Sequence, residues 1–366
     1  MPVALHRHVG QLAVVGFAGT TLPPEIAALA REFDLGGIIL FARNVETPEQ
    51  VAEIAVEARQ LARDLPLWVG IDQEGGRVAR LKRGFTEWPP MAALGRSGDA
   101  ALAERFARAL ALELREVGIS IDFAPVLDVL TNAKNPAIGD RALSDRADTV
   151  ASLGTAIIRG LQDGGVAACG KHFPGHGAAG VDSHLDLPLI ENPPDSFDAV
   201  DFVPFRAAID AHVAALMTGH LLVPAFDERH PATLSKPIVQ GLLREKLGFD
   251  GLVFTDDLEM KAISARMSRE RAVSGAIAAG CDVALLCGTD CAAHASALEA
   301  LVHAVEQEEI SYKRIENALQ HQRFAKERFA GVSLGRSWRP KPAATLPSVL
   351  GCTTHQLIAE EMRRFV

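Results

Sequence analysis

Eight short apolar runs recur along the chain, and a longer stretch with helical periodicity follows each of them. Runs that are apolar throughout are typical of strands in a parallel sheet that is covered on both faces. The runs are residues 12–16, 37–41, 67–72, 121–125, 166–171, 214–218, 252–256 and 283–286. The fold class is therefore α/β. About eight β-then-α repeats favour a single-domain (β/α)8 TIM barrel over an open doubly wound sheet.

The segments between the runs carry apolar residues at helical spacing. The expected helices are 24–33, 48–61, 100–117, 147–161, 202–212, 238–247, 270–279 and 292–305. We assign residues 1–334 to the barrel domain. Pro and basic residues in 337–347, followed by a possible short helix at 355–365, make residues 335–366 an expected C-terminal arm that packs on the barrel.

The charge balance narrows the possible partners. Lys and Arg total 37 and Asp and Glu total 46, so the net charge is −9. Nucleic acid and anionic membranes are not expected partners, because both require a basic face on the protein. No apolar stretch approaches the roughly 18 uninterrupted residues of a membrane span.

The cysteines and the N-terminal residues indicate the cellular compartment in which the protein is expected. Five cysteines without a C-x-x-C pair are typical of small buried side chains in a reducing environment. The first residues lack the basic region and long apolar stretch of a secretion signal. We therefore expect a cytoplasmic protein, and we expect it to be a monomer.

Polar side chains stand at or soon after the ends of five expected strands. They are Asp72, Asp128, Lys171 with His172, His220 and Asp256. Barrel enzymes carry their chemistry at the carboxyl ends of the strands, so these side chains are expected to converge on one mouth of the barrel.

The densest group of reactive side chains is KHFPGHGAAGVDSH, residues 171–184. Its glycines and Pro174 predict a mobile loop rather than a helix. Its three histidines suggest a metal site, but zinc ligands are usually paired at fixed spacing, and Lys171 would place a positive charge beside the ion. We therefore expect no metal here.

A second interpretation of this loop pairs Asp182 with His184. A carboxylate two residues away can orient the imidazole and favour its protonated form, which gives a proton donor and acceptor near neutral pH. The alternative is a capped turn that contains an incidental histidine.

The run at 252–256 delivers two adjacent carboxylates, Asp256 and Asp257, to the barrel mouth. Because side chains alternate along a strand, only one of them is expected to face the axis. A carboxylate there can be a nucleophile, a metal ligand or a helix N-cap, and the capping role suits Asp257 better.

The segment 70–80 contains two adjacent glycines but no phosphate-binding or dinucleotide-binding motif. Asp72 is placed to hold sugar hydroxyls. Arg80 and Arg141 are placed to bind an acyl, carboxylate or hydroxyl oxygen, although isolated arginines more often form surface ion pairs.

Six motifs, in order, resemble those of glycoside hydrolase family 3 β-N-acetylhexosaminidases of bacterial cell-wall recycling, the NagZ group. The motifs are IDQEGGRVAR (71–80), FAPVLDV (123–129), GDR (139–141), KHFPGHG (171–177), DSH (182–184) and TDDLEM (255–260). The resemblance spans about residues 15–330, which is the whole expected barrel.

The resemblance implies a role for each matched residue. Asp256 matches the catalytic nucleophile, His184 the general acid/base and Asp182 its partner. The matched substrate-binding residues are Asp72, Arg80, Arg141, Lys171 and His172. Residues 1–334 would then be the catalytic domain.

The implied reaction is the retaining hydrolysis of terminal β-1,4-linked N-acetylglucosamine, through a covalent intermediate, without a cofactor. The implied substrates are muropeptide fragments in which N-acetylglucosamine is linked to anhydro-N-acetylmuramic acid, or similar chitooligosaccharides. Two rivals stay open: a phosphorylase of the same fold, in which phosphate replaces water, and a non-catalytic sugar-binding barrel.

Overall fold

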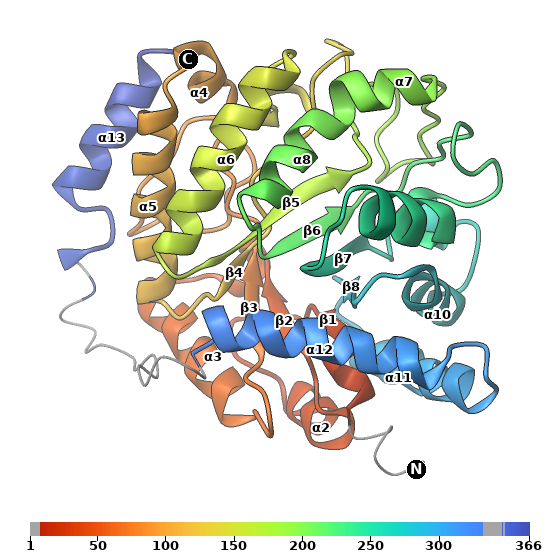
Figure 1. The fold of residues 1–366 in the computed structure, drawn as a ribbon. Coiled ribbons are helices and arrows are strands. Elements are labelled where there is room, and N and C mark those ends of the chain that lie inside the picture. Colours follow the sequence, from red (N-terminus) through yellow and green to blue (C-terminus); the bar gives the residue numbers. More distant parts are fainter. Residues whose placement is uncertain (1–7, 332–345, 347) are drawn as a thin grey trace.

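Eight parallel strands close into a barrel in the order β1 to β8, with β1 paired to β8 (Figure 1). The computed structural model describes residues 8–331, 346 and 348–366. The strands are β1 (Ala13–Val15), β2 (Gly37–Leu40), β3 (Trp68–Ile71), β4 (Ile121–Asp122), β5 (Ala167–Phe173), β6 (Ala215–Thr218), β7 (Leu252–Asp257) and β8 (Val283–Leu286). Each overlaps one of the eight predicted runs, so the predicted (β/α)8 barrel is confirmed.

Helices surround the barrel (Figure 1). The α-helices are α2 (Pro24–Phe33), α3 (Pro48–Gln60), α4 (Ala92–Ser97), α5 (Ala100–Glu116), α6 (Ala147–Asp163), α7 (Pro194–Ser196), α8 (Phe202–Asp210), α9 (Lys261–Ser264), α10 (Arg269–Ala279), α11 (Cys291–Glu306), α12 (Tyr312–Phe329) and α13 (Thr353–Arg363). The 3-10 and π-helical segments are η1 (Val9–Leu12), η2 (Ala42–Asn44), η3 (Gly139–Arg141), η4 (Phe197–Asp201), η5 (Ala232–Leu234) and η6 (Pro237–Lys246).

Helix starts follow local sequence signals. The carboxylate of Asp99 accepts hydrogen bonds from the first turn of α5, and that of Asp290 does the same for α11. Proline occupies the first turn of α2 and α3, where its missing N–H costs nothing. None of the described helices is both long enough and apolar enough to cross a membrane.

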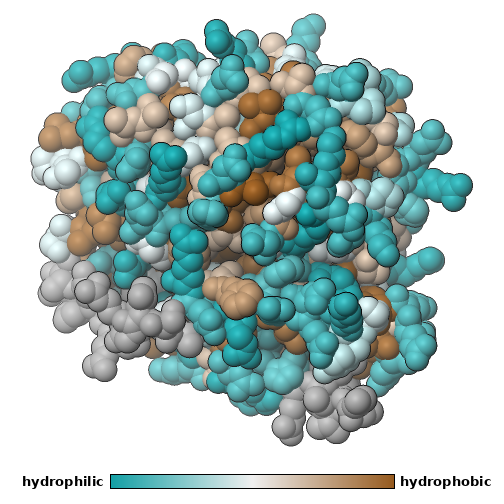
Figure 2. Space-filling view, in the orientation of Figure 1, coloured by the Kyte–Doolittle hydropathy of each residue, from teal (hydrophilic) through white to brown (hydrophobic). Residues whose placement is uncertain are grey.

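The core has an inner and an outer part. The inner part fills the barrel and includes Phe123 and Phe254, whose rings meet edge to face with their centres 5.4 Å apart. The outer part lies between the strands and the helices. On the face drawn in Figure 2, hydrophilic side chains predominate, and a group of apolar side chains shows near the centre.

Helix α12, which the sequence analysis did not predict, closes the amino-terminal end of the barrel. The Trp68 indole donates to Gln322 Oε1 at 2.8 Å, and the fully buried Lys326 ammonium donates to Gln11 Oε1 and to the Gly36 carbonyl, both at 2.7 Å. The buried face of α12 therefore includes polar side chains, so a search for apolar residues at helical spacing does not find this helix.

Helix α13 covers the predicted segment 355–365 with a shift of two residues, and it packs against α5 and α4. Its anchor is the buried carboxylate of Glu113 on α5, which accepts from the Gly351 N–H at 2.9 Å and pairs with His355 Nδ1 at 2.8 Å. The predicted boundary at 334/335 and most of 337–347 lie outside the described residues.

A second buried carboxylate, Asp282, ties the outer helices to the strands. It forms ion pairs with Arg244 and Arg314, lies 3.1 Å from His321 Nδ1 and accepts from the Val253 N–H at 3.0 Å. Burial would raise the pKa of Asp282, but the neighbouring Arg244, His321 and Arg314 side chains lower it to about 2.

Asp282→Asn is expected to lower the free energy of unfolding at neutral pH by about 3 kcal/mol or more, because the partly buried Arg244 and Arg314 lose their fully buried counterion. An unfolded aspartate has a pKa of about 3.9, so the Asp282 carboxylate stabilises the fold above about pH 4, and this contribution is lost as the pH falls toward about 2. Denaturant unfolding at several pH values should show a shallower acid dependence in the variant. Asp163→Asn is the matched control, because Asp163 forms an exposed ion pair with Arg108. Equal losses in both variants would contradict the assignment.

Candidate active site

One cavity of about 420 Å³ opens at the carboxyl ends of the strands. It brings together the eight residues to which the sequence analysis assigned a site role: Asp72, Arg80, Arg141, Lys171, His172, Asp182, His184 and Asp256. Asp128 and His220, also expected at the mouth of the barrel, are buried and do not line this cavity. Apolar residues of the inner core, among them Ile39, Phe123 and Leu285, also line it. The cavity thus combines polar, charged side chains with apolar ones, as binding sites for small molecules commonly do.

Asp256 lies near the end of β7 and lines the cavity. Burial would raise the pKa of its carboxyl group, but the neighbouring His172 and His220 side chains outweigh burial, so the pKa lies below its ordinary value. The Asp257 N–H also donates to Asp256 Oδ1 at 2.8 Å. Asp256 is therefore ionised at neutral pH, as a nucleophilic carboxylate must be.

Asp257 lines the same cavity, so the prediction that only one of the pair faces inward is wrong. The pairing register between β7 and β8 shifts between Phe254 and Asp257, and this irregularity breaks the strict alternation of side chains. The carboxylate accepts from the Glu259 and Cys287 N–H groups, both at 3.1 Å, and burial raises its pKa to about 6. The expected capping role is also wrong in detail, because Asp257 holds two loops, whereas α9 begins after Met260.

His220 fixes the backbone beside the candidate nucleophile. Its Nε2 lies 2.8 Å from the Asp257 carbonyl oxygen, and because a carbonyl can only accept, Nε2 carries the proton. Its Nδ1 lies 2.8 Å from Thr233 Oγ1. The imidazole is completely buried, so it positions the strand end rather than contacting a ligand.

Lys171 and Glu74 form the charged base of the opposite wall. The Lys171 ammonium is 2.7 Å from Asp72 Oδ1 and 2.7 Å from Glu74 Oε1. Two guanidinium nitrogens of Arg141 donate to Glu74, Nε to Oε2 at 2.9 Å and Nη2 to Oε1 at 2.7 Å. Burial would raise the pKa of Glu74, but Arg141 and Lys171 lower it well below its ordinary value. One buried carboxylate therefore sets the positions of two cations in the cavity.

The arginines differ in their surroundings. The Arg141 side chain is only 13% exposed, so the alternative of a surface ion pair is wrong for it. Arg80 lies 3.5 Å from Asp72 Oδ2, and its backbone N–H donates to Gln73 Oε1 at 2.7 Å. The Gln73 N–H in turn donates to the buried Asp122, which ties the 73–81 loop to the end of β4.

Asp128 organises the start of the loop after β5. Its carboxylate is fully buried and lies 2.7 Å from His172 Nδ1. It also accepts from the backbone N–H groups of His172 and His176, at 3.2 and 2.7 Å. Burial would raise the pKa of Asp128, but His172 and His176 lower it, so the group is an anion that fixes both histidines.

Asp182 and His184 are hydrogen-bonded to each other. Asp182 Oδ1 lies 2.8 Å from His184 Nδ1 and also accepts from the His184 backbone N–H at 2.9 Å. A carboxylate only accepts, so Nδ1 carries a proton, and Nε2 is the nitrogen that can exchange a proton with a ligand. The His184 side chain is 70% exposed, which lets it reach a group at the cavity mouth.

The loop that leads from β5 to the Asp182–His184 pair contains three glycines. At two of them, close packing leaves no room for a side chain. A Cβ on Gly177 would lie 1.7 Å from the Val129 carbonyl oxygen, and one on Gly175 would lie 2.6 Å from Asp201 Oδ1. The predicted loop also begins later than expected, since Lys171 and His172 still belong to β5.

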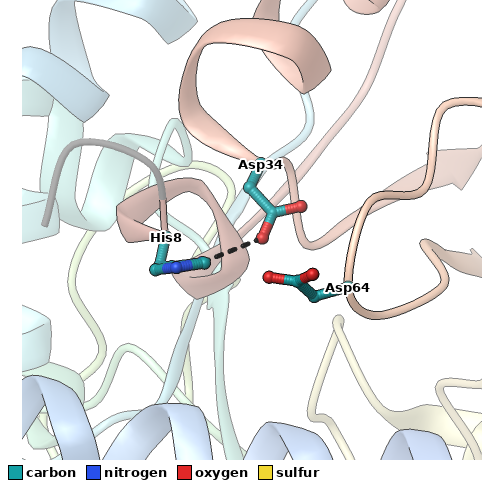
Figure 3. A group of neighbouring side chains, drawn as sticks. All are labelled: His8, Asp34 and Asp64. Atoms are coloured by element: carbon teal, nitrogen blue, oxygen red, sulfur yellow. Dashed lines mark hydrogen bonds and ion pairs between the residues drawn. The ribbon is translucent and has the colours of Figure 1, made fainter. Parts of the chain in front are cut away.

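A possible metal-ligand group lies elsewhere. In the part of the chain that the structure describes, His8, Asp34 and Asp64 place one ligand atom each within 4.8 Å of one another (Figure 3). These residues precede β1, β2 and β3, so the group sits at the amino-terminal end of the barrel, away from the cavity. It takes no part in the candidate active site.

Comparison with known proteins places the chain in a family. Residues 4–323 match the model of the glycosyl hydrolase family 3 N terminal domain. A β-hexosaminidase of Thiobacillus denitrificans is 42% identical over 276 residues, which are 74% of this chain and 76% of that protein. The chain belongs to glycosyl hydrolase family 3.

Two solved structures extend the likeness to the whole fold. A family 3 β-N-acetylglucosaminidase from Paenibacillus has a TM-score of 0.93 at 41% identity, over 99% of this chain and 68% of that one. NagZ from Neisseria gonorrhoeae, solved with N-trifluoroacetyl-D-glucosamine, has a TM-score of 0.76 at 29% identity, over 97% of both chains. The family resemblance stated from the six motifs is therefore confirmed.

The structure adds two residues that the sequence analysis did not assign to the site: Glu74 and His176. Each lies inside one of the six motifs, but a motif does not show what a carboxylate contacts. The sequence signal that could have identified Glu74 is its charge. A carboxylate within a motif of a buried site needs cationic or N–H partners nearby, so it is expected to contact other residues of that site.

Proposed function

We propose that this family 3 enzyme is a β-N-acetylhexosaminidase that removes terminal β-linked N-acetylglucosamine with retention of configuration. The observation that carries the proposal is that the hydrogen-bonded Asp182–His184 pair lines the same cavity as the ionised Asp256. A nucleophile and a proton donor at one cavity are the two groups that a retaining glycosidase needs.

In the first step, Asp256 attacks the anomeric carbon while His184 Nε2 gives its proton to the departing oxygen. The product is a glycosyl ester of Asp256 and a free aglycone. In the second step, neutral His184 takes a proton from water, whose oxygen attacks the same carbon and releases the carboxylate. Asp182 holds the imidazole and stabilises its protonated form. Most retaining enzymes use a carboxylic acid as the donor, but the chemistry requires a matched proton affinity rather than one functional group.

The opposite wall would hold the sugar ring. Lys171, Arg141 and Arg80 supply N–H donors, and Asp72 accepts from hydroxyl groups. This charged wall supports a polar, hydroxyl-rich ligand. The N-acylglucosamine analogue bound by the NagZ neighbour supports an N-acetylated sugar.

We extend the proposal to the substrate and its setting through the resemblance to the cell-wall-recycling group. The enzyme would cleave N-acetylglucosamine from anhydro-N-acetylmuramic acid in muropeptides, in the cytoplasm, without a cofactor.

The test is incubation of the enzyme with the disaccharide of N-acetylglucosamine and anhydro-N-acetylmuramic acid, with and without phosphate. Free N-acetylglucosamine in both conditions is expected. A sugar 1-phosphate that forms only with phosphate would show a phosphorylase instead, and the absence of any cleavage would show a sugar-binding barrel.

Glu74→Gln is expected to lower kcat/KM about tenfold or more, mainly through KM. The amide keeps the size of the side chain but removes the charge that orients Lys171 and Arg141. Kinetics on a nitrophenyl β-N-acetylglucosaminide measure this. Glu104→Gln, which alters an exposed pair with Arg108, is the control. An unchanged KM in the Glu74 variant would show that the carboxylate does not position these cations for binding.

A further inference from the structure

The 182–184 segment is buried at its middle residue and exposed at its end. Ser183 is only 4% exposed, whereas the side chains of Asp182 and His184 are 26% and 70% exposed. Such a pattern is unusual for a serine between two polar residues in a loop, because serine is mostly exposed. Ser183 therefore fixes the segment, and its two neighbours project from it.

Two contacts hold Ser183. Its hydroxyl oxygen lies 3.4 Å from His176 Nε2, and its carbonyl oxygen accepts from the Ala262 N–H at 3.2 Å. Ala262 belongs to α9, which follows the strand that carries Asp256. The segment that bears the candidate acid/base is thus tied both to its own loop and to the element after the candidate nucleophile.

His176 is itself held rigidly. Its backbone N–H donates to Asp128, the carboxylate that also fixes His172, and its carbonyl oxygen accepts from Asn135 Nδ2 at 2.8 Å. The ring is 2% exposed and lies edge to face with His172, with the ring centres 5.7 Å apart. The Ser183 hydroxyl therefore meets a fixed partner rather than a mobile one.

The proton on His176 can be assigned from its surroundings. Burial lowers the pKa of His176 to about 4, so the ring is neutral at neutral pH and carries one N–H. Its Nδ1 is buried and has no hydrogen-bond partner among the described residues. A buried N–H without an acceptor is rarer than a bare lone pair, so the proton sits on Nε2 and is donated to Ser183 Oγ.

We propose that the His176–Ser183 contact anchors the 182–184 segment, and that Ser183 and His176 are positioning residues for the His184 acid/base. The inference rests on the proposed function, since it assigns His184 that role. Losing the contact leaves the Asp182–His184 pair intact but lets it shift relative to the departing oxygen, and a shift of about 1 Å can cost up to about a hundredfold in rate.

The test compares two substrates whose cleavage rates depend to different degrees on general-acid catalysis. Protonation matters most for a poor leaving group, so it matters more for a β-linked N-acetylglucosamine disaccharide than for a nitrophenyl glycoside. Ser183→Ala should lower kcat on the disaccharide about tenfold or more relative to the nitrophenyl substrate, with KM little changed. Ser183→Thr, which keeps the hydroxyl, should restore most of the disaccharide activity.

Further variants separate positioning from folding. His176→Gln keeps an N–H donor near the position of Nε2 and should retain more disaccharide activity than His176→Leu, which should reproduce the Ser183→Ala pattern. Leu185→Ala, on the same loop and 68% exposed, is the control and should behave as wild type. Thermal unfolding of each variant reports whether the fold survives.

Equal losses on both substrates in Ser183→Ala and His176→Leu, or no loss in either, would overturn the anchor while the proposed function stands. If the unaltered enzyme cleaved neither substrate, the proposed function itself would fail.

Discussion

Asp256→Ala is expected to lower kcat by roughly a thousandfold or more, because removing a covalent nucleophile abolishes the first chemical step. The fold should be little affected, since Asp256 lines the cavity and accepts a hydrogen bond from the N–H of its neighbour Asp257. Single-turnover kinetics with a nitrophenyl β-N-acetylglucosaminide and thermal unfolding measure the two effects.

The neighbouring carboxyl provides the matched comparison. Asp257→Asn keeps an acceptor oxygen for the Glu259 and Cys287 N–H groups and should cost far less activity than Asp256→Ala. A reactive 2-fluoro glycosyl reagent should label Asp256 in the unaltered enzyme. Mass spectrometry that finds the label on Asp257, or finds none, would contradict the assignment of the nucleophile.

His184→Ala should reduce cleavage of a β-linked disaccharide by about a hundredfold or more, and cleavage of a nitrophenyl glycoside much less, because the nitrophenolate leaves without a proton. Asp182→Ala should show the same preference more weakly, since the imidazole remains but loses the carboxylate 2.8 Å from Nδ1. Steady-state kinetics of both variants on both substrates provide the measurement. Equal losses of His184→Ala on the two substrates would reduce this histidine to a residue that holds the loop.

The fold could be predicted because each of its strands lies in or overlaps a mostly apolar run. The parallel strands are covered on both sides, so each reads as a continuous stretch such as Gly37–Leu40 or Val283–Leu286. Helix α12 escaped prediction because two of the positions that it buries, Gln322 and Lys326, are polar and interrupt its apolar spacing. Their side chains donate to buried backbone carbonyl groups at the end of the barrel.

The candidate site could be predicted from two signals. Strand ends indicated Asp72, Lys171, His172 and Asp256, and the family motifs indicated the remaining four residues, Arg80, Arg141, Asp182 and His184. The cavity includes every residue to which the motifs assigned a role. Glu74 was missed because its importance lies in two partners that are distant in the sequence, Lys171 and Arg141. Asp128 was expected at the mouth of the barrel, but it is buried and holds His172 there instead of lining the cavity. The orientation of Asp257 was predicted wrongly because strict alternation fails where the register between two strands shifts.

The most direct test of the central claim is proton NMR of the first-formed sugar during hydrolysis of a nitrophenyl β-N-acetylglucosaminide. Attack by Asp256 followed by attack of water inverts the anomeric carbon twice, so the β-anomer of N-acetylglucosamine should appear first and then mutarotate. Initial appearance of the α-anomer would mean a single displacement by water, and it would contradict a covalent intermediate on Asp256.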